Sequence, residues 1–162
     1  MNLINLFNIF NLDNLTIDLK IVNIDIVLNN NDKEAAWLMY VELITRVATQ
    51  RLEDNLGIEA TALDSIYKLF PITREILKTK GRKAKNFTIV SIIFLNKMIR
   101  PFTSKWHKKS LEKAFEDENE CAEFRRELFS LQDCLINYCK LLSYIAGVED
   151  LTYIKEDEYQ HS

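Results

Sequence analysis

The sequence feature that most constrains the fold is a heptad repeat of apolar residues in the last third of the chain. Steps of three and four residues alternate through Cys121, Phe124, Leu128, Leu131, Leu135, Tyr138, Leu142 and Ile145. This spacing places the side chains on one stripe of an α-helix. Asp117 followed by Glu120 is typical of a helix start, and Gly147 of a helix end. The pattern predicts one long helix that buries a single face.

The residues before this helix predict three more long helices. Apolar periodicity favours helices over about 32–54, 59–80 and 84–113. Pro71 and Pro101 fall inside the second and third of these patterns. Each proline removes a backbone hydrogen bond, so we expect the second helix to kink or split at residue 70 and the third to bend.

The start of the first helix is indicated by Asn31 and Glu34, which have the spacing of a capping box. On a helical wheel, Trp37 and Tyr40 fall on the apolar half. The chain has only 3 glycines and 2 prolines in 162 residues, which favours long helices and leaves no glycine-rich phosphate loop. Long helices joined by short loops become antiparallel neighbours. We therefore predict an all-α fold with an antiparallel four-helix bundle over residues 31–147.

The two ends of the chain differ from this central part. Residues 1–30 are rich in asparagine, which recurs every third position at the start, and such a period drifts around a helix without forming a face. From Leu15 to Leu28 apolar and polar residues alternate, which predicts an extended segment with one or two short strands. A lone strand must fold back, pair with a second copy or stay disordered. Residues 148–162 form an acidic tail that we expect to be loose.

Charge is distributed unevenly along the chain. Between Lys78 and Lys113 there are eleven basic residues and one acid, Glu112, whereas both flanking segments are net negative and the whole chain has a net charge of −3. The basic segment therefore either pairs with its own acidic flanks or faces an anionic partner.

The basic segment supplies the first candidate site. Its members are Arg82, Lys83, Lys85, Lys97, Arg100, Lys105, His107 and Lys108. Basic residues at a helix start favour binding of a phosphate or another anion, including nucleic acid. The alternative is a solvated face that neutralises acids of the last helix, namely Glu116, Glu118, Glu120 and Glu123.

A second candidate is a pocket formed by Arg74, Arg100, Trp106 and His107. The proline at 101 would bend the helix there, and Trp106 could stack on a base or another flat ligand. The alternative is that Trp106 is a core residue. No nucleophile and base can be paired in the sequence, so we expect binding rather than catalysis.

The remaining chemistry-bearing residues predict neither a metal nor another cofactor. The three cysteines and two histidines lack the close spacing of a zinc site, and reduced thiols in the cytosol are the simpler interpretation. The longest apolar run, Phe87 to Leu95, is too short to cross a bilayer, and no secretory signal is apparent. We expect a cytoplasmic protein without a membrane partner.

Three segments resemble stretches of small bacterial all-helical proteins to which no activity is attached. They are 37–46 (WLMYVELITR), 69–75 (LFPITRE) and 99–107 (IRPFTSKWH), and the resemblance covers about residues 33–152. In architecture alone, a basic four-helix bundle is similar to the accessory proteins of diversity-generating retroelements and to the ribosomal-RNA intervening-sequence proteins. This resemblance implies the helical fold and carries no activity.

Together these features predict a non-enzymatic helical binding module that forms a homo-oligomer. Its basic face, residues 82–108, would bind nucleic acid or an acidic protein surface. The competing hypothesis is a small-ligand or catalytic protein, and it requires the four residues of the candidate pocket to converge.

Overall fold

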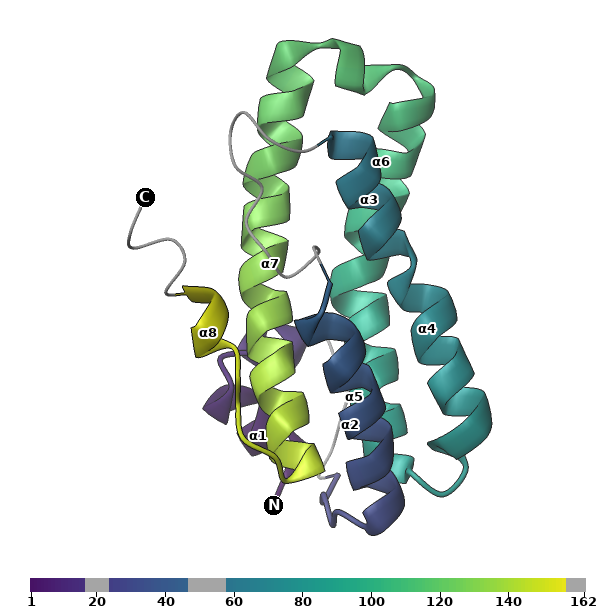
Figure 1. The fold of residues 1–162 in the computed structure, drawn as a ribbon, viewed down its shortest axis with the longest axis vertical. Helices are drawn as coiled ribbons and strands as arrows, with labels where there is room; N and C mark the ends of the chain where they lie inside the picture. Colours follow the sequence, from purple (N-terminus) through teal and green to yellow (C-terminus); the bar gives the residue numbers. More distant parts are fainter. Residues whose placement is uncertain (17–23, 47–57, 157–162) are drawn as a thin grey trace.

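The computed structural model describes residues 1–16, 24–46 and 58–156, and this part of the chain is all-α (Figure 1). Within the described residues there is no strand, and the helical elements follow in the order α1 (Leu3–Ile9), η1 (Asp13–Thr16), α2 (Asn30–Ile44), α3 (Glu59–Tyr67), α4 (Leu69–Ile76), η3 (Leu77–Gly81), α5 (Lys85–Phe94), η4 (Leu95–Ile99), α6 (Arg100–Leu111), η5 (Ala114–Glu116), α7 (Glu118–Ala146) and α8 (Tyr153–Glu156). In Figure 1, α2 and the α5–α6 segment run in one direction, and α3–α4 and α7 run in the other.

The helix predicted from the heptad repeat is α7. The Asp117 side chain accepts hydrogen bonds from the backbone N–H groups of Asn119 and Glu120, and Gly147 ends the helix with a φ of 70°. From Phe124 onward, all the heptad side chains are buried. Helix α7 packs along α2, so the stripe faces other helices of the same chain.

Helix α2 begins earlier than predicted. The capping box is formed by Asn29 and Asp32, not by Asn31 and Glu34. Trp37 is 46% exposed, so its predicted place in the core was wrong. The buried face instead consists of Asp32, Ala35, Ala36, Met39, Tyr40 and Leu43. The helix ends at Ile44, ten residues short of the predicted end, and residues 47–54 lie outside the described part of the chain.

The second and third predicted helices are each interrupted close to their proline. The second divides at Lys68, between α3 and α4, so Pro71 lies in the first turn of α4. A backbone N–H in the first turn has no intrahelical partner, so the N–H that proline lacks is not missed there. The third contains a π-helical turn, η4, directly before Pro101. A π-turn at this point accommodates the hydrogen bond that the proline cannot make.

The N-terminal segment differs most from its prediction. Residues 3–9 form the helix α1, because over only two turns the three-residue period still keeps Leu3, Leu6 and Phe7 on one buried face. Its partner is the extended segment after residue 24, since Leu3 N–H donates to the Ile24 carbonyl and Ile26 N–H to the Met1 carbonyl. The pairing is limited to one isolated bridge, so the predicted strand is absent from residues 24–28, and residues 17–23 lie outside the described part.

The acidic tail, which we expected to be loose, contacts the protein at Leu151 and Thr152. Leu151 N–H donates to the hydroxyl of the buried Tyr40, 2.8 Å away. Thr152 is buried and makes two hydrogen bonds to the Asp150 carboxylate. The backbone at Leu151 is therefore held against α2. Within the described ranges, no helix is both long and apolar enough to cross a membrane.

Candidate anion-binding surface

Three of the predicted basic residues lie in the turn from η3 into α5. Arg82, Lys83 and Lys85 are exposed, and we call them the basic turn. None of the three forms an ion pair with any residue that the structure describes. The turn is held in place through backbone atoms, because the Asn29 side-chain amide donates to the Lys83 carbonyl at 3.0 Å. Among the described residues, no acid therefore neutralises these three charges.

The helix start beside the basic turn already holds an anionic group. The carboxylate of Asp32, a fully buried residue, accepts a hydrogen bond from Phe87 N–H at 3.0 Å and another from the Asn86 amide at 2.9 Å. This carboxylate occupies the place that a phosphate would take at the N-terminus of α5. A visiting anion would therefore contact the side chains of the basic turn, not the end of the helix.

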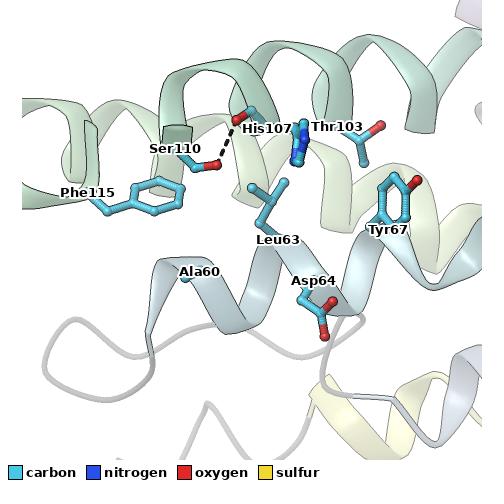
Figure 2. A pocket seen from close by; sticks show the side chains of 8 residues that line it. All are labelled: Ala60, Leu63, Asp64, Tyr67, Thr103, His107, Ser110 and Phe115. Carbon is cyan, nitrogen blue, oxygen red and sulfur yellow. Dashed lines mark hydrogen bonds between the residues drawn. The ribbon is translucent and has the colours of Figure 1, made fainter. Parts of the chain in front are cut away.

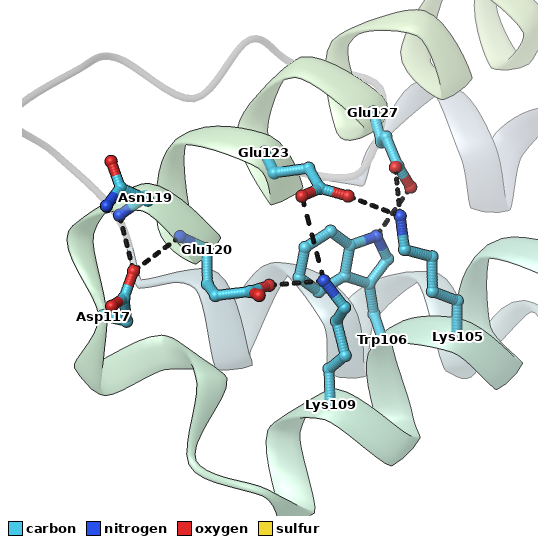
Figure 3. Close-up of polar contacts among 8 residues, drawn as sticks. All are labelled: Lys105, Trp106, Lys109, Asp117, Asn119, Glu120, Glu123 and Glu127. Carbon is cyan, nitrogen blue, oxygen red and sulfur yellow. Dashed lines mark hydrogen bonds and ion pairs between the residues drawn. The ribbon is translucent and has the colours of Figure 1, made fainter.

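Further along the chain, two lysines are neutralised internally (Figure 3). Lys105 lies 2.7 Å from Glu123 and 2.5 Å from Glu127, and Lys109 lies 2.5 Å from Glu120. We call these five residues of α6 and α7 the charge ladder. Of the four acids expected to neutralise the basic face, Glu120 and Glu123 do so, whereas Glu116 approaches Lys113 and no ion pair of Glu118 is found among described residues.

The charge ladder covers the indole ring of Trp106. Trp106 Nε1 donates to Glu127 at 2.9 Å, and the ammonium groups of Lys105 and Lys109 lie 5.0 and 4.9 Å from the ring centroid. The side chain is completely buried, and Phe124 packs edge-on against it at 5.0 Å. Trp106 is thus a core residue, as the alternative interpretation of the sequence had it, with a satisfied polar tip.

The charges of the ladder shift one another's pKa values in the favourable direction. Hydrogen bonds to Glu123 and Glu127 raise the pKa of Lys105. Hydrogen bonding and charge attraction from Lys105 lower the pKa of Glu123. Both shifts favour the ionised pair. Lys105 is therefore a poor candidate for binding an external anion.

The other side of α6 borders a cavity in which Tyr67 of α3 lies close to His107 of α6 (Figure 2). The rings of Tyr67 and His107 lie in nearly parallel planes, 24° apart, with centroids 6.5 Å apart. Phe70 packs 5.8 Å from Tyr67, and the Arg100 guanidinium lies 5.2 Å from the Phe70 centroid. These residues line two separate cavities, which the contact between Tyr67 and Phe70 connects. We call the surface that Tyr67, Phe70, Arg74, Arg100 and His107 form across both cavities the aromatic groove.

Two cavities follow this groove between α3–α4 and α5–α6. One, of about 230 Å³, is bordered by Phe70, Arg74 and Arg100, among others. The other, of about 370 Å³, is bordered by Asp64, Tyr67 and His107, together with Ala60, Leu63, Thr103, Ser110 and Phe115. The Asp64 carboxylate is paired with Lys68 at 2.7 Å, so it adds little net negative charge to the groove.

The four residues of the predicted pocket do not line one cavity in the described part of the chain. Arg74 and Arg100 meet at the smaller cavity and His107 lies at the larger one, but Trp106 points away into the core toward Glu127. Of the remaining basic residues, Lys108 is exposed without an ion pair to a described residue. Lys97 borders a different cavity, between α6 and α7.

The titratable residues suggest no metal site. Within residues 1–16, 24–46 and 58–156, no group of three or more His, Cys, Asp or Glu side chains is placed to hold a metal ion. The three cysteines form no disulfide. Burial raises the pKa of the Cys134 thiol, which disfavours the reactive thiolate.

No family model, curated protein or solved structure matches the chain. The resemblance to small bacterial helical proteins stays a prediction.

Proposed function

We propose that this protein is a non-enzymatic helical binding module that binds nucleic acid through cations left exposed on its basic segment. The observation that carries the proposal is the division of those cations into two groups. Lys105 and Lys109 are neutralised by acids of α7, whereas Arg82, Lys83 and Lys85 have no ion pair with a described residue. Net negative charge elsewhere on the chain makes this concentration of positive charge a local feature.

The exposed cations are spread along the helical path of α5, η4 and α6. At 1.5 Å per residue, the helical path from Lys85 to Lys108 is roughly 35 Å long. Arg100 lies between them and also has no ion pair with a described residue. A phosphate backbone repeats its charge every few ångströms, so it can contact both ends of such a surface, whereas a small anion can contact only one.

The test is binding of a labelled single-stranded RNA and of a duplex DNA, followed by fluorescence anisotropy at about 50 and 200 mM salt. We expect the affinity to fall roughly tenfold or more over this range, because at least three phosphate contacts release counterions. Lys83→Gln is compared with the control variant Lys113→Gln. Lys113 is also an exposed lysine, but it already lies near an acid, Glu116. Absence of binding at the lower salt would refute the proposal.

Three further properties belong to the same proposal. We propose that the long helical segments work as an antiparallel four-helix bundle, that the protein acts in the cytoplasm, and that it forms a homo-oligomer. The oligomer cannot use the heptad stripe, since that stripe is buried against the chain's own helices. Light scattering of the intact chain tests the homo-oligomer. A monomer mass at working concentration would refute the homo-oligomer without affecting the binding proposal.

A further inference from the structure

The aromatic groove presents an unusually exposed ring next to positive charge. Tyr67 is 55% exposed at the end of α3, although it packs against Phe70 on one side and His107 on another. An aromatic ring held by neighbours but open to solvent is already ordered before a ligand arrives. Stacking on such a ring therefore costs little conformational entropy.

Two arginines accompany the rings. The Arg100 guanidinium lies over Phe70, and its Nε donates to the Asn96 side chain at 3.1 Å, which fixes its direction. Arg74 borders the same cavity, and neither arginine forms an ion pair with a described residue. Arginine can both stack on a planar group and bind a phosphate with two parallel hydrogen bonds. The groove thus alternates surfaces for bases with groups for phosphates.

Two other exposed aromatic residues, Tyr153 and Trp37, lack this combination. Tyr153 is 50% exposed on α8, a four-residue helix, and borders none of the cavities described above. Trp37 is exposed on α2 with Tyr40 as its ring neighbour. Exposed single aromatic residues need no functional explanation. The arrangement around Tyr67 differs because rings, cations and cavities occur together.

We propose that the aromatic groove binds bases of a single-stranded nucleic acid, with Tyr67 as the stacking platform and Arg74 and Arg100 as phosphate contacts. This inference rests on the proposed function and adds the class of ligand. In a duplex the faces of the bases are covered by neighbouring bases, so a duplex offers only its phosphates to the groove. The protein therefore prefers single strands to duplexes of the same sequence.

The experiment compares Tyr67→Ala and Tyr67→Phe with the control Tyr153→Ala on the full chain. Probes are a labelled single-stranded RNA, the corresponding RNA duplex and polyglutamate. Loss of a stacking platform is worth about 1–3 kcal/mol per base, so Tyr67→Ala should weaken single-strand binding roughly tenfold. Tyr67→Phe keeps the ring and should stay within about twofold of the unmodified protein, as should Tyr153→Ala. Duplex affinity should not change in any of the variants.

The outcomes separate this inference from the proposed function. Equal binding of single strand and duplex, with no loss in Tyr67→Ala, overturns the base-stacking inference while the proposed function stands. Absence of any nucleic-acid binding overturns both. Tighter binding of polyglutamate than of RNA would identify an acidic protein surface as the partner and also overturns the inference. Equal thermal midpoints of the Tyr67 variants and the unmodified protein show that a change in affinity does not come from a loss of folding stability.

Discussion

The buried carboxylate of Asp32 accepts the backbone N–H of Phe87, so one side chain joins the beginnings of α2 and α5. The same carboxylate completes the capping box of α2 through Asn29 N–H, 3.0 Å away, and accepts from the Asn86 amide. It thereby satisfies donors at two helix starts, and the Phe87 N–H would otherwise lie unpaired in the interior. The basic turn leads into the first residue of α5, so this carboxylate, together with the Asn29–Lys83 hydrogen bond, helps to hold the three exposed cations in place.

Replacing Asp32 should destabilise the protein more than replacing an exposed carboxylate. We expect Asp32→Ala to lower the free energy of unfolding by about 2–4 kcal/mol, because a lost cap costs about 0.5–2 and each buried unpaired donor about 1–3 kcal/mol. Denaturant unfolding measures the change. Asp25→Asn, which removes an exposed carboxylate, is the control and should change the value by less than about 0.5 kcal/mol. Equal effects of the two substitutions would contradict the role assigned to Asp32.

A second prediction concerns the contact between Trp106 and Glu127. Glu127→Ala leaves the buried indole N–H without its acceptor and should cost about 1–3 kcal/mol of unfolding free energy. Glu127→Gln keeps an acceptor oxygen and should cost less. Tryptophan fluorescence reports the environment of the indole ring, with Trp37→Phe as background to remove the exposed tryptophan. If both variants unfold at the same denaturant concentration as the Trp37→Phe background, the hydrogen bond contributes nothing measurable.

The charge ladder predicts a particular pH dependence. Because the folded-state pKa of Glu123 is lowered, the stability that this carboxylate contributes is present above its ordinary value of 4.5 and is lost as the pH falls through the folded value. The raised pKa of Lys105 acts oppositely: its contribution is present below 10.5 and is lost as the pH rises through the folded value.

We therefore expect the difference in unfolding free energy between the unmodified protein and Glu123→Gln to be constant near neutral pH and to shrink below about pH 4.5. High salt should reduce the difference, since the pair is partly exposed. A matched variant, Glu118→Gln, removes an exposed acid of α7 without an ion pair to a described residue, so its difference should be small and should not follow this profile. A difference for Glu123→Gln that does not shrink on acidification would contradict the assignment.

Helix α7 could be predicted from the sequence because every signal for it is local. The steps of the heptad, the cap at Asp117 and the stop at Gly147 each depend only on residues within about one helical turn. The face of α2 could not be predicted in the same way. Ala35 and Ala36 are buried on the helix that packs along α7, whereas the larger Trp37 is left exposed. Apolar size on a helical wheel does not indicate which neighbour a helix approaches.

The surface was predictable only in part, because its contacts join residues that are far apart in the sequence. The acids in the sequence of α7 predicted that some lysines would be neutralised. They did not predict that Lys105 and Lys109 would form the ion pairs. Two partners of the Asp32 carboxylate, Asn86 and Phe87, lie 54 and 55 residues away in sequence. The pairing of Tyr67 with His107 depends on α3 lying beside α6, which no local pattern specifies.

The most direct test of the central claim is the dependence of single-stranded RNA affinity on salt. Each phosphate contact contributes about 0.7 to the slope of log affinity against log salt concentration for a single strand. Combined replacement of Arg82, Lys83 and Lys85 by Gln should therefore reduce the magnitude of the slope by about 2, whereas Lys113→Gln should leave it unchanged. A slope that is the same with and without the basic turn would contradict the account.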